Sequence, residues 1–325
     1  NPKNIGLFTR DISSKVVDGE YDIAIHSWKD LPIEPSSGTE IIGTLERGDM
    51  RDIMIVKKDT AILKYKKNIK ILTSSPRRKY NIKNILPDLL PMEIDSMSFS
   101  DIRGNIETRL NKFISGDADI VLMAKVAIDR LMRSGNQNTI NAVKEILFRT
   151  KWMILPLSIF PTAPGQGAIA IEARKNSLHL KDLIKPINAL GTFEDVKKEK
   201  SILSQYGGGC HQKIGVSIWN ARHVRMCSLI GETEDGGSLN TMGPLDKKPY
   251  DMVKKVSSDD IYPNKSDNNM FVRKSILNEQ IKTLKKSFIF ISRKNVIDSC
   301  GSIHKSNIFW TSGVKTWRYA ARKGY

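Results

Sequence analysis

The apolar residues of this chain recur alternately with the spacing of amphipathic helices and of short strands. Phe8, Ile12 and Val16 stand at helical spacing, and the turn Asp18-Gly19-Glu20 ends that predicted helix. Residues 21–25 then alternate between apolar and polar side chains, as a half-buried strand does. Because this succession of helix and strand continues along most of the chain, we predict an α/β fold built on parallel sheets.

The remaining elements follow from the same periodicities. Strands are predicted over residues 69–72, 91–97, 119–123 and 169–171. Four helices are predicted. The first begins at Pro76, the second has the buried stripe Ile106, Leu110 and Phe113 and ends at Gly116, the third is short and runs to Arg130, and the fourth covers about residues 192–203. The Pro- and Gly-rich residues 161–167 indicate a segment that crosses between units. Beyond Asn220 the pattern weakens, and residues 244–269 are polar and turn-rich, as in a loop or linker.

Composition limits the classes of partner. The 325 residues suggest two or three domains, and the 40% of hydrophobic residues suffices for real cores. A formal charge of +17 favours anionic partners, which include nucleic acid, an anionic membrane and acidic small molecules. An equally good interpretation is that the scattered lysines reflect a general compositional habit. No apolar run approaches the about 20 residues that span a bilayer, so we expect no membrane association.

The cysteines and the chain ends bear on cellular context. Cys210, Cys227 and Cys300 are an odd, sparse set without CxxC spacing, which argues against a disulfide framework or a zinc site. A reducing compartment fits this pattern, and we expect a cytoplasmic location. The chain starts at Asn1 without an initiator methionine and stops at Tyr325 without a closing element. We therefore expect a piece of a longer protein.

Basic residues follow several of the predicted strands. In Ser75-Pro76-Arg77-Arg78, Ser75 is placed as an N-cap and Pro76 as the first helical residue. The free N–H groups and the two guanidinium groups there suit a carboxylate. The alternative is an ordinary capped helix with solvated arginines. Since parallel strands collect their carboxyl ends at one edge, further cations after strands are expected to share this site; they are Lys29, Arg103, Arg109 and Arg130.

An acidic residue stands among these cations. Asp30 is the only acid in His26-Ser27-Trp28-Lys29-Asp30, and neighbouring cations would keep it ionised. It could stabilise positive charge that develops in a transition state, or simply be the structural partner of an arginine. We interpret His26 as a hydrogen-bonded structural residue rather than a base.

The loop Gly207-Gly208-Gly209-Cys210 places a thiol beside a backbone that other groups can approach closely. Nearby cations could raise its thiolate fraction. Taken alone, Cys210 could equally be a buried, inert cysteine after a turn. No Ser–His–Asp or Cys–His order accompanies it.

Together these motifs resemble the porphobilinogen deaminase (hydroxymethylbilane synthase) family. The resemblance covers about residues 5–220, and the motifs stand in the family's order and at similar spacings. They are His26-Ser27-Trp28-Lys29-Asp30-Leu31-Pro32, Arg51-Asp52, Thr73-Ser74-Ser75-Pro76-Arg77-Arg78, Arg103-Gly104-Asn105-Ile106-Glu107-Thr108-Arg109-Leu110, Ala163-Pro164-Gly165-Gln166-Gly167-Ala168 and Gly208-Gly209-Cys210.

The resemblance implies a transferase of tetrapyrrole and haem biosynthesis. Such an enzyme joins four porphobilinogen molecules head to tail, with release of ammonia, to form hydroxymethylbilane. A dipyrromethane cofactor would be attached covalently through Cys210, and Asp30 would be catalytic. Cofactor-binding residues would be Lys29, Ser75, Arg77, Arg78, Arg103 and Arg109. Substrate-binding residues would be Arg103, Arg109 and Arg130.

The resemblance also implies an architecture of two domains like type II periplasmic binding proteins and a smaller α+β third domain that carries the cysteine loop. We expect a discontinuous domain 1 at residues 1–48 and 158–180, without its N-terminal part, domain 2 at 49–157 and domain 3 at 181–285. Phe288-Ile289-Phe290-Ile291-Ser292-Arg293 and Trp310-Thr311-Ser312-Gly313-Val314-Lys315-Thr316 resemble pieces of uroporphyrinogen-III synthase. This resemblance implies that residues 286–325 are the start or a remnant of such a segment, and that the chain is fused to, or cooperates with, that enzyme.

Two other classes of function are alternatives to a porphobilinogen deaminase. A non-catalytic anion-binding module of periplasmic-binding-protein type would need neither Cys210 nor Asp30. A nucleic-acid binder would fit the charge, but the chain has no recognisable nucleic-acid motif or basic strip interleaved with aromatics. We therefore expect a small-molecule substrate, no nucleic-acid partner, no metal and a monomer.

Overall fold

The computed structural model describes residues 7–33, 35–58, 67–90, 92–207, 212–221, 224–245, 280–299, 301–304 and 306–325. The chain divides into two compact units, one of residues 1–85 and 94–245 and the other of residues 86–93 and 246–325. Helices and strands alternate along much of the first unit, so the fold is mixed α/β as predicted.

A three-stranded sheet carries the motif around Asp30. Its order is β1 (Ile23–Ser27), β8 (Ile169–Arg174) and β2 (Thr39–Thr44), and β8 is antiparallel to both neighbours. Helix α1 (Leu7–Asp18) precedes β1, as predicted, and α7 (Leu178–Ile184) and the short η3 (Lys185–Ile187) follow β8. The prediction of purely parallel sheets is wrong here, because β8 returns from the distant part of the chain and enters the sheet between two local strands.

A five-stranded sheet has the order β5-β4-β6-β3-β7. Its strands are β3 (Asp52–Lys57), β4 (Asn68–Leu72), β5 (Ser96–Ser100), β6 (Ile120–Ala124) and β7 (Thr150–Ile154). Strand β4 is parallel to β5 and β6, whereas β3 is antiparallel to β6 and β7. The carboxyl ends of β4 and β6 therefore lie at one edge, and the amino end of β3, with Asp52, lies at that same edge.

The strand predicted over residues 91–97 is β5, which starts later, at Ser96. The reason is that Ser96 is paired with Asn68 at the start of β4, so the ladder begins only where the neighbouring strand offers partners. Serines alternate with Met97 and Phe99 in this strand, which is the pattern of a half-buried strand.

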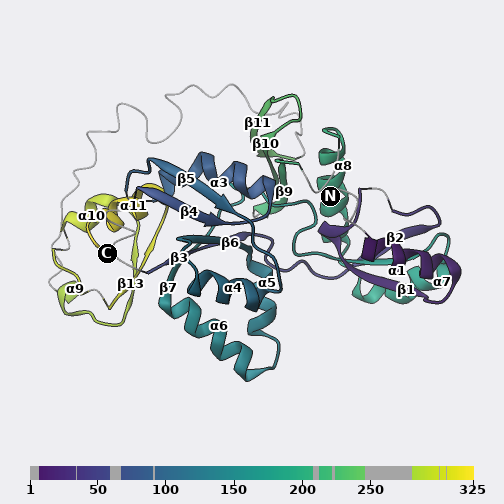
Figure 1. Ribbon diagram of the computed structural model, residues 1–325, viewed down its shortest axis with the longest axis horizontal. Coiled ribbons are helices and arrows are strands. Elements are labelled where there is room, and N and C mark those ends of the chain that lie inside the picture. The colour runs from purple at the N-terminus through teal and green to yellow at the C-terminus, as the bar shows by residue number, and fades with distance from the viewer. Residues whose placement is uncertain are drawn as a thin grey trace, which may run out of the picture. The chain divides into compact units, whose positions relative to one another are not determined.

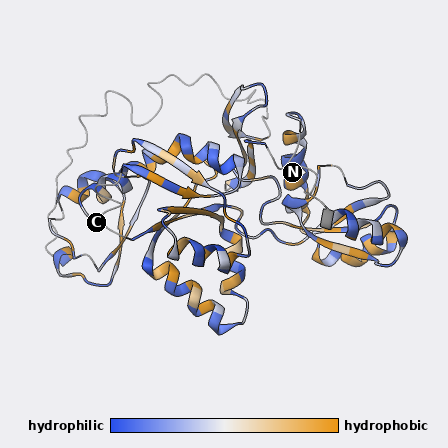
Figure 2. Cartoon of the chain, in the orientation of Figure 1, coloured by the Kyte–Doolittle hydropathy of each residue, from blue (hydrophilic) through white to orange (hydrophobic). Residues whose placement is uncertain are grey.

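Helices cover both faces of the five-stranded sheet. They are α3 (Pro76–Leu89), α4 (Ile106–Ser115), α5 (Lys125–Met132) and α6 (Gln137–Arg149). Figure 1 shows α3 on one side of the sheet and α4 and α6 on the other. On the latter side, Leu110 and Phe113 pack against Ile55 and Val121 in one buried cluster. The central strands are the most hydrophobic part of this unit in Figure 2.

The last part of the first unit combines one helix with an antiparallel meander. Helix α8 (Leu190–Ser204) precedes β9 (Gly215–Ala221), β10 (Val224–Glu232) and β11 (Ser238–Pro244), which pair in the order β11-β10-β9. The helix was predicted, but the strands were not. The outer strand β11 is largely exposed, so it lacks the apolar alternation that a half-buried strand shows. The predicted linker at 244–269 lies almost wholly outside the described residues.

The second unit contains a small β–α–β–α arrangement. Strands β12 (Phe288–Ile291) and β13 (Ile308–Thr311) are parallel, and α9 (Gln280–Thr283), α10 (Lys294–Ser299) and α11 (Val314–Arg322) accompany them. Ile291, Ile297 and Ala320 belong to its buried cluster. No helix in the described parts of the chain is long and apolar enough to cross a membrane.

Candidate active site

A short turn presents Lys29 and Asp30 at the end of β1. Residues Trp28–Asp30 form one turn of 3-10 helix, η2. The Trp28 N–H donates to the Ala168 carbonyl at 3.0 Å, and the Leu31 N–H donates to the Trp28 carbonyl at 3.3 Å. Trp28 and Leu31 are buried, whereas Asp30 is exposed and Lys29 half-buried. The two apolar residues therefore anchor the turn and leave the two charged ones at the site.

His26, just before this turn, is a structural residue, as interpreted from the sequence. It is buried, and its Nε2 lies 2.8 Å from a carboxylate oxygen of Glu172. Ser13 and Thr39 hydroxyls donate to the same carboxylate. Although burial raises the pKa of Glu172, the hydrogen bonds from His26, Thr39 and Ser13 lower it overall. These contacts fasten β1, β2 and α1 to β8.

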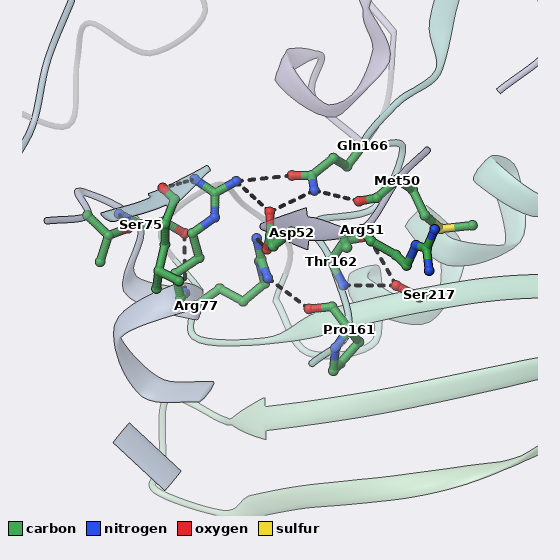
Figure 3. Close-up of polar contacts among 12 residues, drawn as sticks. Met50, Arg51, Asp52, Ser75, Arg77, Pro161, Thr162, Gln166 and Ser217 are labelled. Atoms are coloured by element: carbon green, nitrogen blue, oxygen red, sulfur yellow. Dashed lines mark hydrogen bonds and ion pairs between the residues drawn. The ribbon is translucent and has the colours of Figure 1, made fainter. Parts of the chain in front are cut away.

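A buried carboxylate organises the arginines at the start of α3. Asp52 is fully buried and accepts from Arg77 at 2.8 Å, from Arg78 at 2.7 Å and from the Gln166 amide at 2.9 Å (Figure 3). Burial alone would raise the pKa of Asp52, but Arg78 and Arg77 hold it well below its usual range. Asp52 therefore stays ionised and fixes both guanidinium groups.

The first of these arginines is occupied by the protein itself. Arg77 is only 4% exposed, and its terminal nitrogens donate to Asp52 and to the Pro161 carbonyl, the latter at 2.8 Å. Its Nε is buried and has no partner in the described part of the chain. The predicted N-cap is present, since the Ser75 hydroxyl accepts from the Arg78 N–H at 3.4 Å. Ser75 thus lies at the same helix end as the arginines.

Two further cations, Lys29 and Arg109, lie within electrostatic reach of Arg78, which is itself paired with Asp52. Burial lowers the pKa of Lys29, and the charges of Arg78 and Arg77 lower it further, although Asp30 and Asp52 oppose them. Burial also lowers the pKa of Arg109, and Arg78 adds to that effect. The half-buried Arg109 is oriented by donation from its Nε to the Gly104 carbonyl at 2.7 Å. Lys29, Arg78 and Arg109 therefore interact electrostatically and together favour a bound anion.

Two of the predicted ligands lie at the periphery. Arg103 is exposed in the loop before α4, where its charge lowers the pKa of Asp101, after the larger effect of Lys79. Arg130 is exposed on α5, and its side chain forms no hydrogen bond or ion pair with the described residues. The geometry thus joins Arg109 to the cluster directly and leaves Arg103 and Arg130 with their side chains available.

The predicted attachment point, Cys210, lies outside the described residues, as does Cys300. Cys227 on β10 is of a different kind: burial raises the pKa of its thiol, and the charge of Glu199 adds to that effect. A thiol in that environment is a poor nucleophile.

Several residues that organise the site were not singled out from the sequence. Glu199 on α8 is fully buried and accepts from both terminal nitrogens of Arg47 at 2.9 Å and from the Gly165 N–H at 2.9 Å. The Gln166 amide also donates to the Met50 carbonyl at 2.6 Å. The segments around residues 47–50 and 165–167, which connect the two sheets, are therefore tied to each other and to α8.

The only sequence signal for these residues was their place inside quoted motifs. Asp52 and Gln166 stand in two of them, but a motif does not state which member is buried. Arg47 and Glu199 gave no signal, because their pairing depends on the fold. No group of three or more His, Cys, Asp or Glu side chains within the described ranges is placed to hold a metal ion.

Solved structures give only distant likenesses. A periplasmic sulfonate-binding protein from Methylobacillus flagellatus is 14% identical with a TM-score of 0.33, over 60% of this chain and 56% of that chain. An amino-acid transporter substrate-binding protein from Streptococcus pneumoniae, bound to L-arginine, is 14% identical with a TM-score of 0.28, over 61% of this chain and 69% of that chain. These scores are low, so no conclusion about fold or ligand is based on them.

Sequence comparison is decisive. Residues 2–182 match the family model described as porphobilinogen deaminase, dipyromethane cofactor binding domain. A porphobilinogen deaminase of Caldicellulosiruptor saccharolyticus is 37% identical over 250 residues, which are 73% of this chain and 78% of that protein. One from Chlorobium phaeovibrioides is 35% identical over 212 residues, 65% of this chain but only 61% of that protein. The resemblance seen in the motifs is thereby confirmed, and the chain belongs to the porphobilinogen deaminase family of transferases, the enzymes of tetrapyrrole biosynthesis that carry a dipyrromethane cofactor.

Proposed function

We propose that this chain condenses porphobilinogen head to tail into hydroxymethylbilane with Asp30 as its catalytic residue and Cys210 as the attachment point of the cofactor. One observation carries the assignment of the site: the Gly165 backbone lies against the backbone nitrogen of Lys29, and the side chain of the next residue, Gln166, donates to Asp52 at 2.9 Å. The turn after β1 and the arginine-bearing end of α3 therefore contribute to one site. An anion-binding module alone is not favoured, because the curated relatives are porphobilinogen deaminases.

The charge of this site fits the cofactor. A dipyrromethane made from two porphobilinogen units carries two acetate and two propionate groups, so it needs several cations that the protein has not already neutralised. Lys29 and Arg109 supply such charge. Arg78 is paired with Asp52, but its buried Nε has no partner among the described residues and is a further donor. Ser75 at the α3 N-terminus adds a hydroxyl. We assign these residues, with Arg103, to the carboxylates of the cofactor.

Arg77 requires a different assignment from the other predicted ligands. Its terminal nitrogens are already donated to Asp52 and to the Pro161 carbonyl. We therefore propose that Arg77 supports Asp52 and the crossing segment, whereas Arg78 next to it faces the ligand. For Arg103, Arg109 and Arg130, binding of the incoming substrate stays the proposal made from the sequence.

The proposed reaction requires a residue that stabilises the positive charge that develops on the pyrrole rings. When the aminomethyl C–N bond of porphobilinogen breaks, ammonia leaves with the bonding pair and the pyrrole becomes cationic. A C–C bond then forms to the free α-carbon of the growing chain, which loses its proton to restore aromaticity. Asp30 is exposed while Trp28 and Leu31 on either side of the turn are buried, which supports the assignment of its carboxylate to the stabilisation of these cations. The arginines meanwhile hold the acidic side chains.

The domain division is part of this proposal. We assign residues 1–48 with 158–180 to domain 1, residues 49–157 to domain 2 and residues 181–285 to domain 3. Support comes from β8, which lies between β1 and β2 in one sheet, and from the strand order β5-β4-β6, which is the doubly wound order 2-1-3. A type II periplasmic-binding-protein architecture fits that order. The monomeric state and the cytoplasmic location stay predictions.

A second function is proposed for residues 286–325, which we take as the beginning of a uroporphyrinogen-III synthase-like unit. The specific observation is the parallel pair β12–β13 with α10 and α11. Parallel sheets are normally covered on both faces. Here Phe288, Phe290 and Trp310 are 78%, 64% and 59% exposed, so the sheet offers a second face for further helices.

The cofactor attachment predicts a mass signature. Intact-mass measurement of the purified holoprotein is expected to show a dipyrromethane adduct that is absent from Cys210→Ser. Cys227→Ser is the matched control and should retain the adduct, because its thiol lies on β10 with a raised pKa. An unmodified parent protein, or an adduct that survives in Cys210→Ser, would contradict the assignment.

The role of Asp30 predicts a selective loss of turnover. Asp30→Asn should lower kcat by about 10²–10³-fold, the cost typical of removing one electrostatic stabiliser of a transition state. The adduct should persist, because the cations that hold it are unchanged. Asp22→Asn, at an exposed position before β1, is the control and should be near normal. Steady-state rates per adduct-bearing enzyme measure this, and near-parental turnover in Asp30→Asn would remove it from the mechanism.

The buried ion cluster predicts a large stability effect. Asp52→Asn should lower the free energy of unfolding by about 3–5 kcal/mol at neutral pH, since it leaves two guanidinium groups without their carboxylate. The pKa of Asp52 is depressed by folding, so its contribution is full above about pH 4, its unfolded pKa, and is lost as pH falls. The difference between parent and variant in urea unfolding should therefore shrink in acid. Asp101→Asn, at an exposed carboxylate that pairs with Lys79, should cost much less, and equal losses would refute the ranking.

The second proposed function predicts the isomer of the cyclised product. The natural protein that contains this sequence, assayed with porphobilinogen alone, should release uroporphyrinogen III, because a synthase unit would close the bilane with inversion of one ring. Spontaneous closure gives isomer I, so chromatographic separation of the isomers decides the question. Isomer I alone would refute the second function and leave the first intact.

A further inference from the structure

We propose that Lys200 is a positioning residue for Asp30. This inference rests on the proposed catalytic role of Asp30 and concerns the turn that carries it. Lys200 is on α8, is 7% exposed, and its Nζ donates to the Leu31 carbonyl at 2.8 Å and to the Pro32 carbonyl at 3.4 Å. A buried ammonium group thus donates hydrogen bonds to the backbone immediately after Asp30.

The burial of this lysine is informative. A buried ammonium group is costly unless its donors are matched, and carbonyl oxygens at the end of a turn provide such matching. An aliphatic side chain at this position could fill the same space without that cost. The ammonium therefore contributes something that packing does not, namely a directional hold on the Leu31 and Pro32 carbonyls.

The turn is held to the same helix at two further places. Trp28 packs with Val196 in one buried cluster, and its ring lies 5.4 Å from the ring of Phe193, both on α8. A β-carbon added at Gly165 would lie 3.2 Å from the backbone nitrogen of Lys29, so the Gly165 backbone lies directly against the turn. Gly165 in turn donates to Glu199, the residue before Lys200, at 2.9 Å.

These contacts give α8 control over where the Asp30 carboxylate stands. Glu199 fixes the segment that lies against the middle of the turn, and Lys200 fixes the carbonyls at its end. Because Asp30 is exposed and has no hydrogen-bond partner among the described residues, its position depends on the backbone on either side. Displacement of a catalytic group by about 1 Å can cost 10²-fold in rate. Lys200 therefore sets the catalytic geometry without touching the substrate.

The test compares three single variants of the full chain. Lys200→Met removes the donor but keeps the length of the side chain, and Lys200→Arg keeps charge and donors. Lys198→Met is the matched control, since Lys198 is on the same helix but exposed. We expect Lys200→Met to lower kcat per adduct-bearing enzyme about 10–100-fold with little change in KM or adduct content. Lys200→Arg should recover most of the rate, and Lys198→Met should match the parent.

A second readout does not depend on turnover. Amide hydrogen exchange in a peptide covering residues 28–33 should become at least about 10-fold faster in Lys200→Met, because the Leu31 N–H is protected only while the turn is closed. Exchange in β4 and β6 should be unchanged. A residue that only stabilises the fold would instead raise exchange broadly, lower the unfolding temperature and leave kcat per holoenzyme intact.

The outcomes separate the two proposals. Normal exchange in the turn, or a Lys200→Met rate equal to that of Lys198→Met, overturns the role of Lys200. If Lys200→Met does not fold, Lys200→Gln takes its place with the same two readouts and the same criteria. Absence of turnover in the parent counts against the proposed function alone, since the exchange measurement still decides whether Lys200 holds the turn.

Discussion

The ionised carboxylate of Asp52, buried beneath two arginines and a glutamine, is the interaction on which the site depends. A binding site for polycarboxylates must concentrate positive charge, and like charges at the start of one helix repel each other. One buried anion offsets that repulsion without neutralising the site, since Lys29 and Arg109 lie within electrostatic reach of Arg78 and form no ion pair with any residue that the structure describes. Without the Asp52 carboxylate, Arg77 and Arg78 would still repel each other and their guanidinium groups would no longer be held in place.

The second constraint is that the site is divided between two sheets that the chain joins twice. Each connection must hold its place, and Glu199 serves both by binding Arg47 on one and Gly165 on the other. The Gly48 N–H also donates to the Gly167 carbonyl at 3.0 Å, and a β-carbon at Gly167 would clash with the Gly48 oxygen at 2.7 Å. Glycine is required there for close approach of the two backbones. The helix that carries Glu199 thus influences both sheets through a few buried polar contacts.

The extent of prediction from sequence follows from this distinction between local and long-range contacts. The α4 stripe and the N-cap at Ser75 are local features, and each appears where the pattern places it. The strand before Asp30 begins at Ile23 instead of residue 21, and it buries Ala24 and His26 while Ile23 and Ile25 are exposed, so its predicted apolar face is wrong. The antiparallel entry of β3 and β8 is not local, so the expectation of parallel sheets was wrong for them. Helix α8 shows the limit most clearly. Its buried stripe is Asp195, Val196, Glu199, Lys200 and Leu203, and the charged members of that stripe conceal its buried face from any hydropathy pattern.

The same distinction explains why a motif with adjacent arginines does not reveal what each one does. Successive residues of an α-helix point about 100° apart, so two neighbours at a helix start lie in different surroundings even where their long side chains reach one common group. Arg77 is buried, and its terminal nitrogens donate to the Asp52 carboxylate and to the Pro161 carbonyl. Arg78 is half-buried, donates to the same carboxylate and acts electrostatically on Lys29. Arg77 therefore stabilises the structure around the site, whereas we assign Arg78 to binding of the ligand. A motif that keeps both cations therefore preserves two different functions, and exchange of either for lysine would lose the forked geometry that each requires.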